Sequence, residues 1–384
     1  MKTFKFKLYA SKHNRKLGRR IEIAANVYNH CIALHKRYYK LFDRHLNANA
    51  LKKHLTKLKK QRRFAFWSQL GSQAMQDIVE RIDRGYRRFF DDRKRGVRSG
   101  PPTFKKKYKY RSFTLKQCGY KYDGDNRITI GKRVFRFFKS REIEGEIRTL
   151  IVKRDATGDF YVIFTCETEE RRTFVERTGK SVGYDFGLSL FLTASDENDV
   201  ESPLFLHEEM KEIRKLNRNL SKKKKGSNNR RRARLELARA YRRVAARRDD
   251  FHWKTALDIV RRYDVVCLED LCIKGMQRRF GKKIGDLGFS GFVRKLKYQA
   301  EKHGKTVVRT DRFFASSQIC SDCGSRNREL KDLRIRRWVC PECGGTHDRD
   351  RNAAWLVSIP ESPPFREGST SNTSEDRNVI PDGA

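Results

Sequence analysis

Three carboxylates in the second half of the chain stand where acids are uncommon, in an apolar strand or at a helix start. They are Asp185 in the segment 181–188, Glu269 in 265–271 and Asp350 in 347–354. A buried ionised carboxylate is costly unless it is paired or holds a metal. Two magnesium ions about 3.5–4 Å apart, bridged by carboxylates, activate water and stabilise the leaving oxygen during displacement at phosphorus. The three acids therefore predict a catalytic site that binds two Mg²⁺ ions and hydrolyses phosphodiester bonds.

The elements around these acids predict that they meet. Asp185 lies on the first strand of an α/β region, Glu269 closes an apolar strand, and Asp350 precedes a short apolar helix. In an open α/β sheet, strand ends and helix starts gather at one edge. We therefore expect a shared site on a ribonuclease H-like sheet. Gly183 and Gly187 flank Asp185, and we expect them to leave room for a phosphate backbone or a metal.

Each acid also has a simpler interpretation. Asp185 alone is compatible with a turn, Glu269 with an ordinary strand end, and Asp350 with a helix N-cap. Asp348 competes with Asp350 for the third position. Asp350 is preferred because it lies directly before the apolar helix 352–357 and so is nearer the helix N-terminus.

Four cysteines have the spacing of a zinc site. Cys320 and Cys323 form one Cys-x-x-Cys pair, Cys340 and Cys343 form another, and sixteen residues separate the pairs. Such knuckles place four thiolates tetrahedrally around one Zn²⁺, and a glycine follows each second cysteine as a tight turn requires. The alternative is a pair of redox dithiols. A closed four-cysteine site predicts a structural zinc, and the other five cysteines are predicted to be packing residues.

The charge of the chain points to a polyanionic partner. Lys and Arg number 89 against 47 Asp and Glu, a formal net charge of +42, and 37% of the 384 residues are hydrophobic. Anionic membrane is the rival partner, but it calls for an amphipathic basic helix or a lipid anchor, whereas this charge is spread over the chain. Nucleic acid is the favoured partner, and no membrane association is expected.

The N-terminus and the cysteines predict a location. Residues 1–10 alternate charged and apolar types, which is not the pattern of a signal peptide, and no run is long enough to span a bilayer. Nine cysteines are an odd count, and four have zinc spacing, which fits a reduced compartment better than a disulfide framework. We expect a cytoplasmic protein; nucleoid association in a prokaryote is implied only by the family resemblance described below.

The hydrophobic periodicity predicts an α+β chain of several domains. Helical spacing indicates helices through residues 19–95, and alternation indicates a strand at 1–10. Further strands are predicted at 112–115, 127–130, 134–137, 149–153 and 160–165, so the N-terminal strand must pair with these and a β domain carries a helical insertion. Later strands are predicted at 181–185, 189–194, 264–269 and 305–310, and helices at 208–224, 229–262 and 286–303.

With these residues in view, the chain resembles the TnpB family, transposon-encoded RNA-guided DNA endonucleases related to the compact type V CRISPR effectors. The resemblance is carried by segments 183–188, 268–276, 316–324, 340–343 and 347–354, with further likeness at 102–107 and 138–145. The family's RuvC-type catalytic acids fall on Asp185, Glu269 and Asp350. Tyr184 and Phe186 replace the commoner Ile and Leu around the first Asp and remain apolar.

The resemblance implies a fold, partners and an activity. The implied organisation is a β-barrel-like wedge domain (1–18 and 97–178), a helical recognition domain (19–96), a RuvC-like nuclease domain (179–315 and 346–358) and an inserted zinc ribbon (316–345). The segment 359–384 is rich in Pro, Ser, Gly and Asn without an apolar period, and this composition predicts a disordered tail. The guide RNA would come from the transposon end, and the protein would cut double-stranded target DNA beside a short flanking motif. An RNA-guided repressor that does not cut, and a strand-joining transposase, are the alternatives.

Several polar residues are candidates for nucleic-acid contacts. Residues 211–248 hold seventeen Lys or Arg against two acids, which favours a channel for a guide–target duplex over a solvated helical pair; Lys222, Lys223, Arg230 and Arg231 represent it. In the family the recognition helices contact the duplex beside the target. Gln73 and Gln76 are candidates there because Gln can pair bidentately with adenine, and Thr114 is a further candidate.

Overall fold

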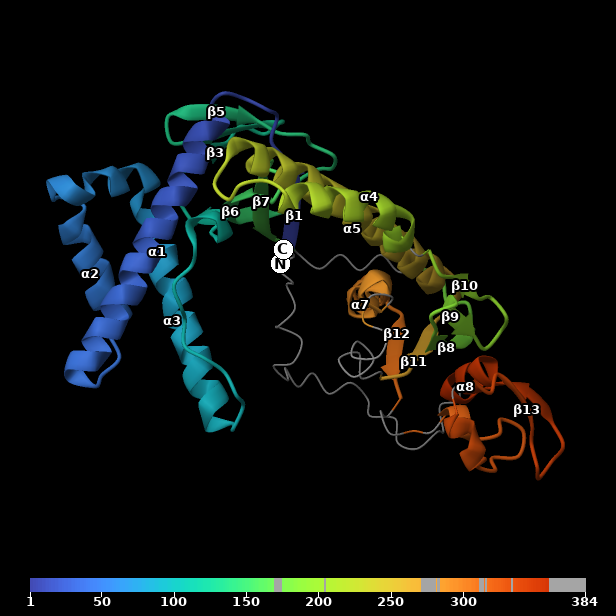
Figure 1. Cartoon of the computed structure of the whole chain (residues 1–384). Coiled ribbons are helices and arrows are strands. Elements are labelled where there is room, and N and C mark those ends of the chain that lie inside the picture. The colour runs from blue at the N-terminus through green and yellow to red at the C-terminus, as the bar shows by residue number, and fades with distance from the viewer. Residues whose placement is uncertain are drawn as a thin grey trace. The chain divides into compact units, whose positions relative to one another are not determined.

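The computed structural model describes residues 1–168, 175–203, 205–270, 281, 284–310, 314, 316–332 and 334–358. The predicted tail at 359–384 lies outside these residues. The chain divides into two compact units, Met1–Glu170 and Arg171–Ala384, each a mixture of helices and sheets (Figure 1). Among the described helices, none is both long and apolar enough to cross a membrane.

The helices of the first unit lie between its first two strands in the sequence. They are α1 (Asn14–Phe42), α2 (Ala48–Leu58), the 3-10 helix η1 (Arg62–Leu70) and α3 (Ser72–Lys94), with a short 3-10 turn η2 (Lys107–Lys109) after them. The buried residues of α1 recur at helical spacing, as in Leu17, Ile21, Ala24 and Tyr28. The helical prediction for 19–95 is confirmed, although α1 begins five residues earlier.

The strands of the first unit form two antiparallel sheets. The larger has the order β1 (Lys2–Lys7), β7 (Phe160–Glu167), β6 (Glu146–Arg154), β2 (Ser112–Leu115), and the smaller joins β3 (Tyr120–Tyr122), β4 (Arg127–Ile130) and β5 (Arg133–Arg136). A bridge between Leu8 and Phe137 continues β1 onto the end of β5. The predicted pairing of the N-terminal strand is confirmed, and β3 was not predicted. Within residues 1–168, no ladder joins β3 to β2, so the barrel-like closure of this unit stays a prediction.

The second unit contains a five-stranded mixed sheet. Its order is β10 (Val200–Glu201), β9 (Leu190–Ala194), β8 (Ser181–Phe186), β11 (Val265–Leu268), β12 (Thr306–Arg309). The first three strands are antiparallel neighbours, whereas β11 is parallel to both β8 and β12. Parallel neighbours need crossover connections. The helical hairpin of α4 (Phe205–Ser221) and α5 (Asn228–Arg262) leads into β11, and α7 (Phe289–His303) leads into β12.

The central strand β8 has two different faces. Val182, Tyr184 and Phe186 belong to a core cluster with residues of α5 and α7, such as Ile259 and Phe292. The intervening Gly183 faces the C-terminal helix α8 (Arg349–Ser358). Because successive side chains of a strand point to opposite faces, Asp185 shares the α8 face with Gly183.

His252 on α5 is a buried group of this core, and we predict that it makes the unit acid-sensitive. Its Nε2 lies 2.9 Å from the carbonyl of Leu287, and burial lowers its pKa to about 4. His252 therefore stays neutral in the folded state at a pH where the same side chain in the unfolded chain, with a pKa near 6.5, is protonated. Stability from neutral His252 is complete above about pH 6.5 and is lost as the pH falls toward 4, about 2 kcal/mol between pH 7 and pH 5.

Hydrogen exchange of the α5 amides at both pH values measures this loss as a free energy of opening. The substitution His252→Phe removes the titrating group and should make the difference between pH 7 and pH 5 smaller by that amount. An equal difference in the wild type and the variant would contradict the prediction.

Candidate functional site

Asp185 and Glu269 come from neighbouring parallel strands. The register pairs Gly183 with Cys267 and Tyr184 with Leu268, so the next residue of each strand is an acid. Asp185 is half-buried near the end of β8, and Glu269 follows β11 directly. Each of the two side chains is among the groups that shift the pKa of the other. One edge of the sheet thus brings together two acids that lie 84 positions apart in the sequence.

Asp350 reaches the same edge on the first turn of α8. Burial, the charge of Glu269 and the charge of Asp350, in that order, raise the pKa of Asp185 well above its ordinary value. Burial also raises the pKa of Glu269. Two acids with raised pKa values beside a third carboxylate are the electrostatic condition under which a divalent cation binds in exchange for a proton.

Asp350 is not packed as tightly into the cluster as the other two acids. Arg336 donates from Nη1 to both oxygens of Asp350, at 3.1 and 3.0 Å. Among the described residues, the groups whose ligand atoms all lie within 4.8 Å of one another are formed by Cys, Asp322 and His347 only. A pair of ions about 3.5–4 Å apart accommodates a wider spacing of carboxylates than a single ion does.

Asp348 has a different role from Asp350. Its Oδ1 accepts from the backbone N–H groups of Asp350 and Arg351, both at 3.1 Å. These bonds satisfy free donors at the start of α8, as an N-cap side chain does. The capping role supports Asp350 as the third acid of the site.

The predicted role of the glycines around Asp185 is wrong. A Cβ at Gly183 would lie 2.1 Å from the carbonyl oxygen of Ala354, and one at Gly187 would lie 2.7 Å from that of Leu190. Both glycines make room for the chain's own backbone and not for a ligand. Gly183 lets α8 pack directly on β8 and so brings Asp350 to the acid pair.

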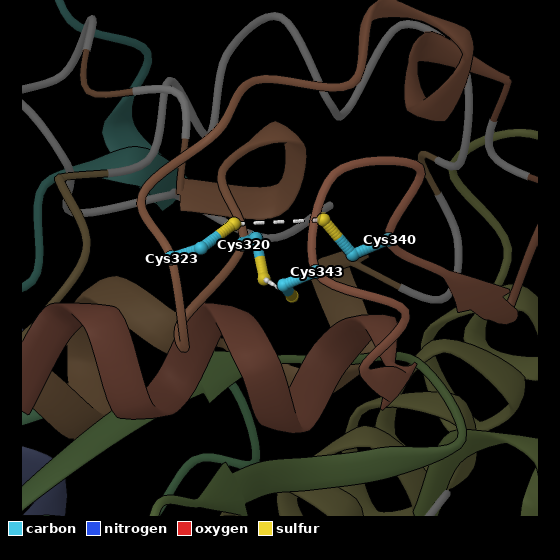
Figure 2. Close-up of side chains that lie close together, drawn as sticks. All are labelled: Cys320, Cys323, Cys340 and Cys343. Atoms are coloured by element: carbon cyan, nitrogen blue, oxygen red, sulfur yellow. Dashed lines mark hydrogen bonds between the residues drawn. The ribbon is translucent and has the colours of Figure 1, made fainter.

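The four predicted cysteines form a second cluster. Cys320 and Cys323 of the first knuckle face Cys343 and Cys340 of the second (Figure 2), with Sγ–Sγ distances of 3.7 Å and 3.6 Å for the facing pairs. Four thiolates at 2.3 Å around one ion would be about 3.8 Å apart. Gly324 and Gly344 have φ of 76° and 73°, the conformation that a tight knuckle requires. The four side chains can therefore hold a metal ion.

The surroundings favour thiolate at two of these cysteines. Ser325 Oγ lies 3.2 Å from the sulfurs of both Cys323 and Cys340. Its hydrogen bonds lower the pKa of Cys323 and lower that of Cys340 to about 6. The other cysteines include Cys31, Cys166 and Cys267, which are buried as predicted; Cys118 is exposed, contrary to the prediction, and Cys272 lies outside the described residues.

His347 and Asn352 belong to the site although the cysteine spacing did not point to them. His347 Nε2 lies 3.1 Å from Cys320 Sγ and 3.7 Å from Asp322. Asn352 on α8 hydrogen-bonds the backbone next to Cys320. A sequence signal existed in hindsight for Asn352, because a polar side chain in the apolar helix 352–357 needs partners.

The predicted nucleic-acid residues are exposed or partly exposed, except Thr114, which is buried. The guanidinium of Arg230 is already used within the protein, because its Nη1 donates to the carbonyls of Leu220 and Lys223 at 2.9 and 2.8 Å. These hydrogen bonds close the hairpin between α4 and α5. Lys222 and Arg231 are exposed. In the first unit, Gln76 lines a small cavity of about 40 Å³ between α2 and α3, Gln73 is half-buried, and Thr114 on β2 is buried.

Taken together, the fold and these clusters define an α/β protein with an acidic cluster at a sheet edge and a four-cysteine cluster that can hold a metal ion. Two family models match the second unit. One, OrfB_IS605, described as "Probable transposase", matches residues 164–279, and the other, "Cas12f1-like, TNB domain", matches residues 289–357.

Curated relatives extend the match along the chain. A "Putative RNA-guided DNA endonuclease" of Streptomyces pristinaespiralis is 28% identical over 92% of this chain and 87% of its own length. The "Putative RNA-guided DNA endonuclease InsQ" of Escherichia coli is 25% identical over 92% and 90%. "TnpB-like protein L79" of Acanthamoeba polyphaga mimivirus is 28% identical over 54% of this chain and 42% of its own length. The predicted resemblance to the TnpB family is confirmed by these relatives, two of which match over most of the chain.

A solved structure supports the fold. The protein in "Cryo-EM structure of the Cas12f1-sgRNA-target DNA complex" has a TM-score of 0.56 to this chain at 15% identity, covering 91% of this chain and 83% of that one. The similarity shows that the arrangement of helices and sheets is shared.

Proposed function

We propose that this chain is an RNA-guided DNA endonuclease that cuts target DNA beside a short flanking motif by two-metal phosphodiester hydrolysis. The observation that carries the proposal is the parallel register of β8 and β11, which puts Asp185 and Glu269 at one end of the sheet, with the charge of Asp350 acting on Asp185. The relatives named as RNA-guided DNA endonucleases, which match over most of the chain, support the same activity.

The proposed catalytic residues are Asp185, Glu269 and Asp350, on a ribonuclease H-like sheet. Carboxylate oxygens are the ligands that Mg²⁺ prefers, and a pair of Mg²⁺ ions bound there would activate water and stabilise the leaving oxygen. Asp185 and Glu269 are fixed by the parallel pairing of β8 and β11, and Asp350 by the packing of α8 on Gly183. Rigid elements hold the three oxyanions in place, so little reorganisation is needed when substrate arrives.

The four cysteines are proposed to hold one structural Zn²⁺. All four coordination positions would be protein thiolates, which leaves none for substrate. The ribbon that they organise includes the hairpin of β13 (Arg337–Val339) and β14 (Thr346–Asp348), which runs directly into α8. The zinc would thus support the element that carries Asp350.

The proposed partners are a guide RNA from the transposon end and a double-stranded DNA target. The helical hairpin α4–α5 offers a basic surface, where a few arginines, such as Arg243 and Arg247, pair with glutamates of α4. Lys222, Lys223 and Arg231 are proposed to contact phosphates, so binding should weaken steeply with salt. The domain boundaries given by the family resemblance are retained as part of this proposal.

The flanking motif is proposed to be read by the first unit. Gln76 shares its cavity with Lys52 and Thr56, which gives an amide, a cation and a hydroxyl at one place on the helical surface. Glu80 of α3 pairs with Lys52 at 3.0 Å and also with Lys116, which follows β2. Gln73 and Thr114 are further candidates. Amides and hydroxyls at base edges supply specificity, whereas phosphate contacts supply affinity.

The proposal is tested by guided cleavage. The chain is expressed with its transposon end, the RNA that co-purifies is sequenced, and matched duplexes with randomised flanks are incubated with the complex and Mg²⁺. We expect cutting that requires the guide match, one enriched flanking motif and the metal. Uncut DNA for every flank would contradict the proposal.

The two alternatives give different products in the same experiment. A guided repressor would bind the matched duplex without cutting it, and a transposase would join transposon ends to a second duplex in a strand-transfer assay. The presence of all three acids disfavours the first. The cysteine ribbon placed immediately before Asp350 disfavours the second.

A further inference from the structure

Asn352 joins the helix that carries Asp350 to the first cysteine knuckle. It lies on α8 two residues after Asp350 and is 4% exposed. Its amide oxygen accepts from the N–H of Ser321 at 2.9 Å, and its amide nitrogen donates to the carbonyl of Ile319 at 2.7 Å. Ile319 and Ser321 are the two chain neighbours of Cys320. One buried side chain therefore fixes the backbone on both sides of a cysteine.

Few side chains could replace Asn352 in this role. Holding a carbonyl and an N–H at once requires a donor and an acceptor on the same short side chain. Leucine has the size of asparagine but neither group, and serine has both groups but a shorter reach. Either substitution would leave buried backbone groups of the knuckle without their partner, which costs about 1–3 kcal/mol per group.

Helix α8 cannot shift toward the sheet to make up for the loss of these hydrogen bonds. The helix backbone is already in contact with the sheet, since a Cβ on Gly183 would meet Ala354 at 2.1 Å. Arg349, one residue before Asp350, also donates to the ribbon, from Nη1 to the carbonyl of Asp332 at 3.0 Å. The first turn of α8 is thus tied to the ribbon, while Ala354 and Ser358 further along the helix face Gly183 of β8, so the ribbon sets the position of Asp350.

We propose that Asn352 is a positioning residue that couples the knuckle at Cys320 to Asp350, so that a metal ion on the four cysteines raises the affinity of the acid site for divalent cations. This inference rests on the proposed function, which makes the acids the ligands of such cations. Outer residues that orient metal ligands typically change metal affinity about 10–100-fold. Coupling between two binding sites is reciprocal, so cations at the acids would also stabilise the ribbon.

The test measures Mn²⁺ binding to the full chain without nucleic acid, by electron paramagnetic resonance, together with zinc content per chain. The variants are Asn352→Leu and Asn352→Ser. The matched control is Asn327→Ala, which removes the same kind of bond inside the ribbon, where the Asn327 side chain accepts from the N–H of Glu329 at 3.0 Å. We expect both Asn352 variants to keep their zinc and to bind Mn²⁺ about 10-fold or more weakly, and the control to match the wild type.

Each other outcome has a distinct meaning. Unchanged Mn²⁺ affinity in both Asn352 variants would overturn the coupling, and so would loss of zinc from both, which would make Asn352 a folding residue of the ribbon. If Asp185→Asn bound Mn²⁺ as tightly as the wild type, the three acids would not be the ligands of the cation. Both this inference and the proposed function would then be wrong. If the Mn²⁺ affinities changed as expected but the complex cut no matched DNA, the coupling between the two sites would be supported and only the proposed endonuclease activity would be contradicted.

Discussion

Replacing Asp185 with asparagine is expected to slow DNA cleavage at least about 10³-fold while guide-dependent DNA binding changes little. Asparagine keeps the shape of the side chain but removes the charge that would attract a cation to the edge of β8. The binding surfaces proposed for the guide and the target lie elsewhere on the chain. Single-turnover cleavage of a matched duplex and its binding in a gel-shift assay measure the two quantities separately.

The same substitution is expected to stabilise the metal-free protein by about 0.5–2 kcal/mol, as is common where a strained functional site is relieved. The pKa of Asp185 is raised by burial and by the charges of Glu269 and Asp350, so ionised Asp185 opposes folding. Denaturant unfolding in the presence of a chelator measures this change. The control is Asp258→Asn, the same chemical change on the exposed face of α5, where Asp258 pairs with Arg262 at 2.7 Å.

Two results would contradict this assignment. Cleavage at the wild-type rate in Asp185→Asn would show that the acid cluster is not the catalytic site. Loss of stability similar to that of a core substitution would show that Asp185 is held by a favourable partner and not by repulsion from its neighbours. In Asp258→Asn, cleavage and stability should both stay close to the wild type.

The acid pair could be predicted from the sequence because strand patterning is a local property. Alternation along 181–186 puts Asp185 opposite to the apolar face, and an acid that ends an apolar run, as Glu269 does, marks the end of a strand. Two strands with the same pattern in a parallel sheet then bring their terminal acids together. The four cysteines were predictable for a similar reason, since each pair is a short-range motif.

The contacts between these motifs could not be predicted, because they depend on which distant backbone comes close. Nothing near Gly183 in the sequence says that the carbonyl of Ala354 occupies the space beside it, and the predicted ligand space was wrong for that reason. Arg230 was predicted as a phosphate ligand from its charge, whereas its contact with two helix-end carbonyls depends on how the hairpin closes. His347 and Asn352 likewise have roles only once the ribbon folds against α8.

Replacing Cys340 with serine is expected to remove the zinc and to reduce guided cleavage at least about 100-fold, although Cys340 belongs to neither strand of the acid pair. Loss of one thiolate from a closed four-cysteine site removes most of the binding free energy, which for structural zinc is about 10–16 kcal/mol. Among its described residues, the ribbon has a small apolar cluster of its own, formed around Leu330 and Trp338. Without the metal, such a cluster is too small to hold the fold.

Loss of the zinc would affect catalysis through the segment that follows the ribbon, because that segment carries Asp350. Strand β14 ends at Asp348, whose side chain caps α8, and the next turn carries Asp350 and Asn352. Limited proteolysis should therefore show new cleavage between residues 316 and 348 in Cys340→Ser, with the first unit as resistant as before. Cys118→Ser is the control, because it makes the same chemical change at an exposed cysteine of the first unit. Full guided cleavage by zinc-free Cys340→Ser would show that the position of Asp350 does not depend on the ribbon, and that β8 alone is sufficient to hold α8 in place.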